Sequence, residues 1–227
     1  MNDHDQPCVR ILLVDDDPLV RAGLRLMLGG SSEVEIVGEA ADGSEVEPLV
    51  DRLAPDVVLM DIRMPTLDGL TATEALRRRP NPPEVIVLTT FNADEHVLRA
   101  LRAGAAGFLL KDTPPAEIVA AVRRVAAGDP ALSPAVTQQL IEHVAGGGQG
   151  SRRSRADTLL ARLNDREREV AVAVGHGKSN AEIGSTLYMS VPTVKTHVSR
   201  ILAKLDLNNR VQIALLAHDA GLLDDVP

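Results

Sequence analysis

The stretch VVLMDIRMPTLDG, residues 57–69, contains an unbroken apolar run that ends at an aspartate. A run without polar alternation is typical of a strand that is buried on both faces of a sheet. Asp61 places a carboxylate beside this apolar surface, where an unpaired charge is costly. Met64-Pro65 follows and indicates a turn. Asp61 is therefore either a turn former or a reactive group.

Similar apolar runs recur along the first 128 residues, and helical patterns separate them. The runs are residues 9–14, 34–37, 57–60, 85–88 and 107–110. The helical patterns cover residues 18–28, 44–52, 69–78, 94–103 and 115–127. Strands that alternate with helices in this order favour a parallel sheet with helices on both faces. The sequence predicts a (βα)5 doubly wound α/β domain over residues 9–128.

The chain changes character after Leu132. A short helical pattern begins at Ser133-Pro134, and the tract AGGGQGSRRSRAD that follows has little to bury, which is typical of a flexible linker. Residues 129–162 are therefore predicted to be a connecting helix and a flexible linker. The remaining helical patterns cover residues 165–174, 180–187, 191–205 and 210–217. They predict an all-α, four-helix domain with helix-turn-helix order over residues 163–223.

Composition fits a globular protein with a charge difference between its two parts. The apolar fraction of 44% is ample for packed cores. Residues 1–150 carry 13 Lys and Arg against 23 Asp and Glu, a net charge of −10, and residues 151–227 carry 11 against 9, a net charge of +2. The first part is thus suited to cations and the second to a polyanion. Without a long apolar segment or an apolar signal sequence, we expect a cytoplasmic protein with no membrane partner.

Polar residues follow four of the five predicted strands. They are Asp15, Asp16 and Asp17 after the first strand, Asp61 after the third, Thr89 and Thr90 after the fourth, and Lys111 after the fifth. Ligands of doubly wound sheets bind at the carboxyl ends of the strands. Carboxylates gathered there repel one another unless a hard cation such as Mg²⁺ bridges them. An aspartate that has a lysine and a hydroxyl beside it can act as a nucleophile toward phosphorus.

Each of these residues alone has a simpler explanation. Asp15 and Asp16 could be turn formers ahead of Pro18, and Asp17 is predicted to cap the helix that begins there. Asp61 alone, before a Met-Pro turn, would more often be structural, and an isolated threonine or lysine carries no signal. The conjunction at one sheet edge is what favours a phosphoryl-transfer site.

The helical part has the features of a DNA-binding helix-turn-helix. Ser190 is suited to cap the helix of residues 191–205, and Pro192 fits its first turn. The apolar stripe of this helix is Val194, Val198, Ile201, Leu202 and Leu205. Its opposite face carries Lys195, Thr196, Ser199, Arg200 and Lys204, which are able to contact phosphates and base edges. A cationic helix face alone is usually just solvated.

Residues 9–128 resemble the receiver domain of two-component response regulators. The motifs LLVDDDP, VVLMDIRMPTLDG, VLTT and GFLLKD carry the resemblance. It implies that Asp61 is the phosphoacceptor and that Asp15, Asp16, Asp61 and the backbone carbonyl of Arg63 hold Mg²⁺. It further implies that Thr89 senses the phosphoryl group, that Lys111 is its counter-charge, and that Phe108 occupies the aromatic switch position. Arg63 and Phe91 would flank the path of the hydrolytic water, and their bulk predicts slow self-dephosphorylation.

Residues 163–222 resemble the DNA-binding domain of the LuxR/NarL/FixJ family through DREREV, GKSNAEI and SVPTVKTHVSRILAKL. The resemblance makes residues 191–205 the recognition helix, with Lys195, Thr196 and Ser199 toward bases. It places Lys178, Asn180, Arg200, Lys204 and Arg210 toward phosphates. The last helix, which includes Leu216, would form a homodimer contact.

The expected function is that of a DNA-binding response regulator. A sensor histidine kinase would phosphorylate Asp61 in a Mg²⁺-dependent reaction, and the phosphorylated protein would dimerise, bind double-stranded promoter DNA and regulate transcription. We do not expect an enzyme. An aspartyl-phosphate hydrolase is one alternative, but such proteins usually need a second aspartate two residues later, where this chain has Arg63. A receiver domain that works without phosphorylation is the other.

Overall fold

The structure is a computed structural model that describes residues 8–89, 94–132 and 149–223. The chain divides into two compact units, Met1–Val136 and Thr137–Pro227. Within the described ranges, no helix combines the length and the apolar character that crossing a membrane requires.

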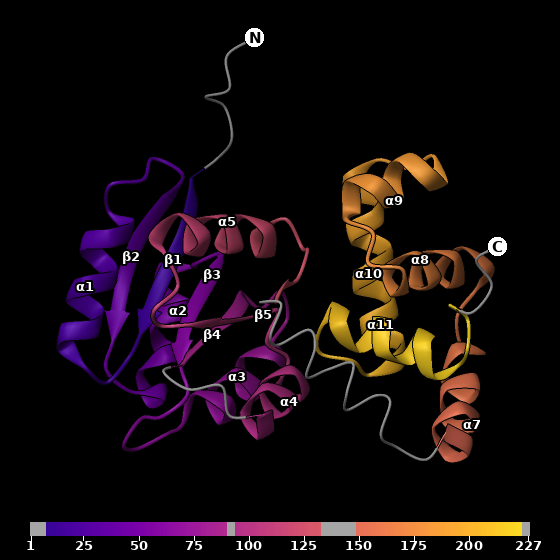
Figure 1. The fold of residues 1–227 in the computed structure, drawn as a ribbon, viewed down its shortest axis with the longest axis horizontal. Helices are drawn as coiled ribbons and strands as arrows, with labels where there is room; N and C mark the ends of the chain where they lie inside the picture. Colours follow the sequence, from indigo (N-terminus) through magenta and orange to yellow (C-terminus); the bar gives the residue numbers. More distant parts are fainter. Residues whose placement is uncertain (1–7, 90–93, 133–148, 224–227) are drawn as a thin grey trace, which may run out of the picture. The chain divides into compact units, whose positions relative to one another are not determined.

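The first unit is built on a six-stranded sheet whose paired strands are all parallel (Figure 1). The strands are β1 (Val9–Val14), β2 (Val34–Ala40), β3 (Val57–Asp61), β4 (Glu84–Thr89), β5 (Gly107–Leu110) and β6 (Ala131–Leu132). Their order across the sheet is β2-β1-β3-β4-β5-β6. All four core residues Ile11 to Val14 of β1 and all five residues of β3 are buried, as their apolar runs predict.

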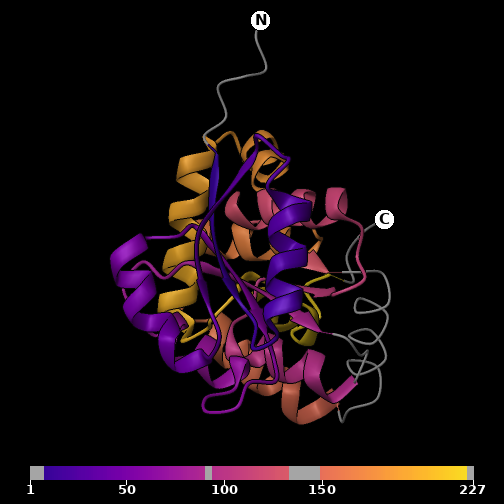
Figure 2. The same cartoon turned by 90° about the vertical axis from the view of Figure 1, so that its left-hand side faces the viewer.

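Helices cover both faces of this sheet. They are α1 (Pro18–Leu28), α2 (Val46–Leu53), α3 (Gly69–Arg77), α4 (Asp94–Ala103) and α5 (Pro115–Ala126), with a short 3₁₀ helix η1 (Gly43–Glu45) before α2. One apolar cluster joins α1 and α5 to one face of the sheet, and a second joins α2 and α3 to the other. Figure 2 shows the strands between α1 and α2. The prediction of a doubly wound parallel sheet is confirmed.

Two details of the sheet differ from the sequence prediction. The strand predicted to end at Val37 continues to Ala40, because an edge strand exposes one side and tolerates the polar Glu39. A sixth, two-residue strand follows α5 and pairs with β5, with Gly107 opposite Ala131. A Cβ at Gly107 would lie 3.0 Å from the Ala131 carbonyl oxygen, so the glycine allows this close approach.

The second unit contains helices only among its described residues. These are α7 (Gln149–Leu160), α8 (Asp165–Gly175), α9 (Asn180–Leu187), α10 (Val191–Leu205) and α11 (Arg210–Asp219). Asn164 and Ser179 begin α8 and α9 with complete capping boxes, and Ser190 caps α10 through the backbone N–H of Thr193. The cap predicted at Ser190 is therefore confirmed. A single apolar core joins α8, α9, α10 and α11.

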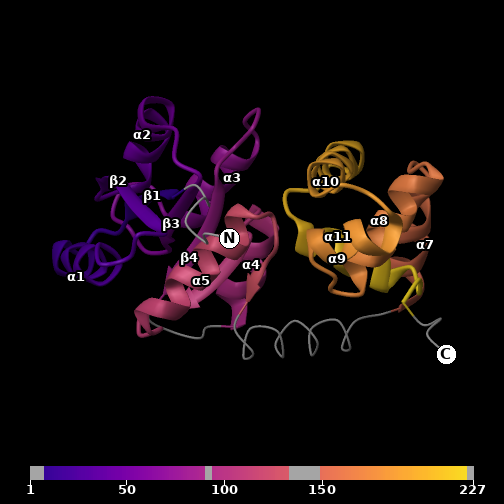
Figure 3. The same ribbon diagram turned by 90° about the horizontal axis from the view of Figure 1, so that it is seen from above.

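The prediction of a flexible linker is wrong for residues 149–160, which form α7. Ala156 and Leu160 are each 1% exposed and pack with Ala220 after α11. Figure 3 shows α7 beside the other helices of this unit. Most residues of this segment are polar, and among its described side chains only those of Ala156 and Leu160 are buried. Two apolar positions are too few to produce a helical pattern in the sequence. The helix predicted over residues 133–144 lies outside the described residues.

Candidate metal centre and nucleic-acid interface

The carboxyl ends of β1, β3, β4 and β5 bring the predicted acidic site together. One carboxylate oxygen from each of Asp15, Asp16 and Asp61 lies within 4.8 Å of the other two. Asp61 is the last residue of β3 and is 6% exposed, and Asp15, which follows β1, is 1% exposed. Asp16 is exposed, so one side of the cluster is open to solvent. The three side chains are close enough to share a single cation.

Lys111 joins the two buried carboxylates of this cluster. Its Nζ lies 2.6 Å from Asp15 Oδ2 and 2.9 Å from Asp61 Oδ1. Burial alone would favour the neutral amine, but the hydrogen bonds from Lys111 to Asp15 and Asp61 outweigh it and raise the pKa of Lys111. The ammonium is therefore kept charged beside the predicted phosphoacceptor.

Asp61 is held in an environment that resists a buried negative charge. Burial raises the pKa of Asp61, and the nearby charge of Asp15 adds to that effect. Lys111 opposes both by donating a hydrogen bond. Three carboxylates and the one ammonium that bridges two of them sum to a net charge of −2. A divalent cation with oxygen ligands would offset that charge, so the residues fit Mg²⁺.

The loop between β3 and α3 folds back over Asp61. Arg63 donates its backbone N–H to Asp61 Oδ2 at 3.2 Å, and Gly69 donates its own to the Ile62 carbonyl at 2.9 Å. A Cβ at Gly69 would overlap with the backbone carbonyl of Asp61, so only glycine fits this contact. Asp68 caps α3 by accepting from the backbone of Leu70 and Thr71. The carbonyl group of Arg63 is thus carried by a loop that is closed at both ends.

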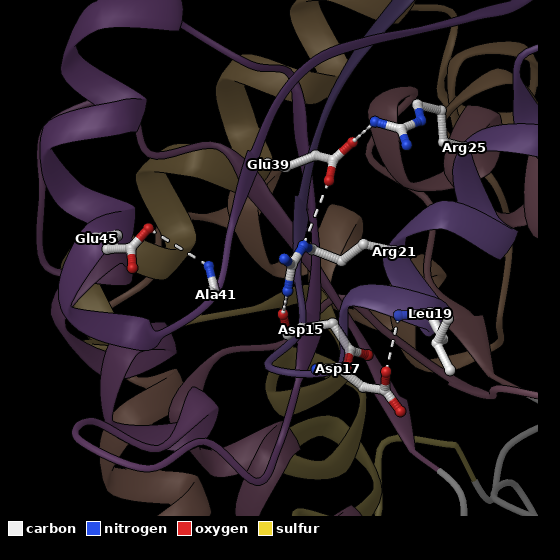
Figure 4. A network of polar contacts seen from close by, with 8 residues as sticks. All are labelled: Asp15, Asp17, Leu19, Arg21, Arg25, Glu39, Ala41 and Glu45. Atoms are coloured by element: carbon white, nitrogen blue, oxygen red, sulfur yellow. Dashed lines mark hydrogen bonds and ion pairs between the residues drawn. The ribbon is translucent and has the colours of Figure 1, made fainter.

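The neighbouring residues of the first helix support Asp15. Asp17 caps α1 by accepting from the backbone N–H of Leu19 at 2.8 Å, which confirms the prediction for Asp17. Figure 4 shows the Arg21 guanidinium between Glu39 and the backbone carbonyl of Asp15, with Arg25 on the other side of Glu39. Arg21 thus holds the backbone carbonyl of Asp15, while Lys111 contacts its carboxylate.

The two predicted switch residues are both buried. Thr89 is the last residue of β4 and is 7% exposed, and its carbonyl accepts from the Lys111 backbone N–H at 2.8 Å. Phe108 is fully buried in β5, where it pairs in register with Val87 of β4 and Leu132 of β6. Thr90 and Phe91 lie outside the described residues.

The polar face of α10 remains accessible. Val194, Val198, Ile201 and Leu205 are buried, and Leu202 is partly buried. Lys195, Thr196, Ser199 and Arg200 are exposed on the other side of the helix. The arrangement gives α10 one face in the core and one face exposed to solvent, which is compatible with a recognition helix.

Three residues that were predicted to contact phosphates bond to other residues of the second unit. Arg210 and Asn180 are 8% and 3% exposed, and Arg210 Nη1 donates to Asn180 Oδ1 at 2.7 Å. Lys204 Nζ lies 2.6 Å from Oε2 of Glu167, which is 2% exposed. We therefore correct the assignments of Arg210 and Asn180, because their buried side chains hold the helices together and are not presented to DNA. The Lys204 side chain is 43% exposed, so its ion pair with Glu167 competes with a phosphate contact but does not exclude one. Lys178 is partly exposed, with its Nζ 3.2 Å from the Thr186 hydroxyl, and remains a candidate.

The sequence prediction also missed Asp42, which lies in the loop after β2. Its carboxylate accepts hydrogen bonds from residues of both that loop and the loop after β3. The dipeptide Asp42-Gly43 was the available signal, but on its own it indicates only a turn.

Comparison with known proteins agrees with both parts of the chain. Residues 11–123 match the family model described as the response regulator receiver domain. Residues 161–217 match the model described as bacterial regulatory proteins, luxR family. The chain therefore belongs to the two-component response regulators with a LuxR-type DNA-binding domain, which are transcriptional regulators.

Several relatives align with this chain over nearly their whole length. The transcriptional regulatory protein LiaR of Bacillus subtilis (strain 168) is 39% identical over 216 residues, which cover 95% of this chain and 100% of LiaR. The response regulator VraR of Staphylococcus aureus (strain NCTC 8325 / PS 47) is 35% identical, with 95% and 99% covered. The crystal structure of the response regulator ChrA of a heme-sensing two-component system matches with a TM-score of 0.53 at 35% identity, over 96% of this chain and 100% of ChrA.

Proposed function

We propose that a sensor histidine kinase phosphorylates this response regulator on Asp61 in a Mg²⁺-dependent reaction, and that phosphorylation promotes dimerisation and promoter binding. One observation carries the proposal. Lys111 Nζ lies within 3 Å of both Asp15 and Asp61, in a cluster of three carboxylates at the carboxyl edge of the sheet. A structural turn would need neither the partly buried lysine nor the convergence of separate strands.

The chemistry expected of Asp61 is nucleophilic attack on phosphorus. A carboxylate oxygen of Asp61 forms the new P–O bond while the P–N bond to the kinase histidine breaks, and the imidazole leaves with the electron pair. Bound Mg²⁺, held by Asp15, Asp16, Asp61 and the Arg63 carbonyl, would supply positive charge to the phosphoryl oxygens. Lys111 would exchange its contact with Asp61 for one of these oxygens. The Thr89 hydroxyl would donate to another, and Phe108 would follow the resulting movement without a hydroxyl of its own.

Intact-mass measurement after incubation with acetyl phosphate and Mg²⁺ tests this proposal. The wild type should gain one phosphoryl group, and Asp61→Asn should gain none. Asp17→Asn is a matched control, because Asp17 lies beside the cluster but caps α1. An aspartyl-phosphate hydrolase would instead release many equivalents of phosphate per chain. A receiver that works without phosphorylation would gain no mass at all, and either result would overturn the proposal.

DNA binding is assigned to the exposed face of α10. We propose base contacts for Lys195, Thr196 and Ser199, and phosphate contacts for Arg200 and Lys178. The exposure of the four α10 residues opposite the buried stripe supports this assignment. Footprinting of genomic fragments with phosphorylated protein would identify the operator. Loss of protection in Lys195→Ala, with an unchanged thermal midpoint, is the expected result.

We propose that α11 contributes to the dimer contact, and a charged substitution on this helix tests that role. Leu216 packs against both apolar clusters of the second unit, so a charge there would disturb folding as well as any dimer contact. Leu215 is partly exposed on the same helix and is a better probe. Leu215→Asp should weaken dimeric DNA binding by the phosphorylated protein. Unchanged binding by a correctly folded Leu215→Asp would count against an α11 dimer.

A further inference from the structure

Asp42 connects two loops at the carboxyl edge of the sheet. It lies between β2 and η1 and is 8% exposed. Oδ1 accepts from the Ser44 backbone N–H at 3.0 Å and from the Ser44 hydroxyl at 2.7 Å. These two bonds cap η1 and are what an aspartate before a short helix ordinarily makes.

The remaining hydrogen bonds of Asp42 reach the loop that follows Asp61. Oδ2 accepts from the Thr66 backbone N–H at 2.8 Å, and Oδ1 accepts from the Leu67 backbone N–H at 3.2 Å. Capping η1 requires neither of them. Hydrogen bonds from Ser44, Thr66 and Leu67 together hold the pKa of Asp42 far below its ordinary value, so the carboxylate stays ionised.

Gly43, which follows Asp42, allows the loop after β2 to approach the loop after β3 closely. A Cβ at Gly43 would overlap with the Leu67 carbonyl oxygen, so the glycine lets the two loops touch. The loop of residues 62–68 is then fixed at its start by the bond from Arg63 to Asp61, in its middle by Asp42, and at its end by the Asp68 cap. Asp42 supplies the only one of these three anchors that comes from outside the β3–α3 segment.

We propose that Asp42 is a positioning residue for the metal centre. By holding Thr66 and Leu67, it sets the conformation of the loop that carries the Arg63 carbonyl, and so the place at which that oxygen meets a cation bound to Asp15, Asp16 and Asp61. The inference rests on the function proposed above. Groups that orient metal ligands in this way typically change metal affinity by about 10–100-fold when they are removed.

Calorimetric titration of the full chain with Mg²⁺, without a phosphodonor, tests the role of Asp42. Asp42→Ala should bind Mg²⁺ about tenfold more weakly than wild type. Asp42→Asn should be intermediate, because the amide oxygen can accept from Thr66 while the amide NH₂ donates to the Ser44 hydroxyl. A purely structural role predicts no such order in the affinities of folded variants.

Two control variants separate loop positioning from stability. Ser44→Ala removes a hydroxyl that donates to the same carboxylate but leaves the bonds to Thr66 and Leu67. Asp56→Asn alters a carboxylate that accepts from the Arg10 backbone N–H at 2.8 Å, at the amino edge of the sheet. Both should bind Mg²⁺ like wild type, and thermal unfolding of each variant would report its stability.

The outcomes distinguish this inference from the function on which it rests. If the wild type does not bind Mg²⁺, both the role of Asp42 and the proposed Mg²⁺-dependent function are overturned. If Asp61→Asn weakens binding while Asp42→Ala and Asp42→Asn bind like wild type, only the role of Asp42 is overturned. Equal weakening in Asp56→Asn and Asp42→Ala would also overturn it. Should Asp42→Ala fail to fold, the comparison between Asp42→Asn and Ser44→Ala decides.

Discussion

Arg210 Nη1 donates a buried hydrogen bond to Asn180 Oδ1 across 2.7 Å, and this contact joins the first residue of α11 to the first residue of α9. A second nitrogen of the same guanidinium donates to the Lys178 carbonyl. Arg210 therefore fixes the position of α9, and with it the turn that leads to the exposed face of α10. A residue that was predicted to contact DNA instead supports the helix pair for which we propose DNA binding.

Substitution of Arg210 should reduce stability, not only DNA affinity. Arg210→Ala leaves the Asn180 side chain and the Lys178 carbonyl without this donor in a buried setting, which costs about 2–4 kcal/mol of unfolding free energy. Arg200→Ala is the matched control, because Arg200 is exposed on α10 and its loss should change stability by less than about 0.5 kcal/mol. Denaturant unfolding of both variants measures the difference. Equal stability of the two would contradict the structural role of Arg210.

Glu167 should make the second unit sensitive to acid. The hydrogen bond from Lys204 is the largest of the effects that lower the pKa of Glu167 in the folded protein. A lowered folded pKa means that the stability is complete above the unfolded pKa of about 4.3 and is lost as the pH falls through the folded value. The thermal midpoint of the second unit, measured in the full chain from pH 7 downward, should therefore fall once the pH drops below about 4.3.

Glu167→Gln provides the control for this acid response. Glutamine can still accept from the Asn164 backbone N–H and complete the capping box, but it carries no titrating charge. The variant should be less stable at pH 7 and should lose less stability on acidification than wild type. A decline of the same size in both proteins would assign the acid response to other carboxylates.

The sequence predicts features that depend on residues close together in the chain better than features that depend on distant residues. Apolar runs and caps act over a few residues, so β1, β3, α1 and the Ser190 cap were predictable. The convergence of Asp15, Asp61 and Lys111 was also predictable, because parallel strands share a carboxyl edge. The partners of Asn180 and Lys204 lie 30 and 37 residues away, and no local pattern identifies them. Helix α7 was missed for a related reason, because Leu160 finds its apolar partners near α11.

The salt dependence of DNA binding should show whether the ion pair between Lys204 and Glu167 keeps Lys204 from a phosphate contact. Removing a phosphate contact lowers the slope of log affinity against log salt concentration by about one. Arg200→Ala and Lys178→Ala should each show such a decrease. Lys204→Met should leave the slope unchanged, because the Lys204 ammonium is bonded to Glu167. Titrations of one operator fragment at several salt concentrations measure these slopes, and a reduced slope in Lys204→Met would restore Lys204 as a DNA contact.

The lifetime of phospho-Asp61 should depend on the side chain of Arg63. This side chain is exposed two residues after Asp61, on the loop that folds back over the site. We propose, from the resemblance to receiver domains, that its bulk limits the approach of water. Arg63→Ala should speed hydrolysis about tenfold, which corresponds to a barrier lower by about 1.4 kcal/mol. Phe91→Ala is expected to act in the same direction, although Phe91 lies outside the described residues. Intact-mass measurement at intervals after removal of acetyl phosphate would follow the decay, with the exposed Arg124→Ala on α5 as control. Decay of the wild type within seconds, with no further increase in Arg63→Ala or Phe91→Ala, would refute the assignment.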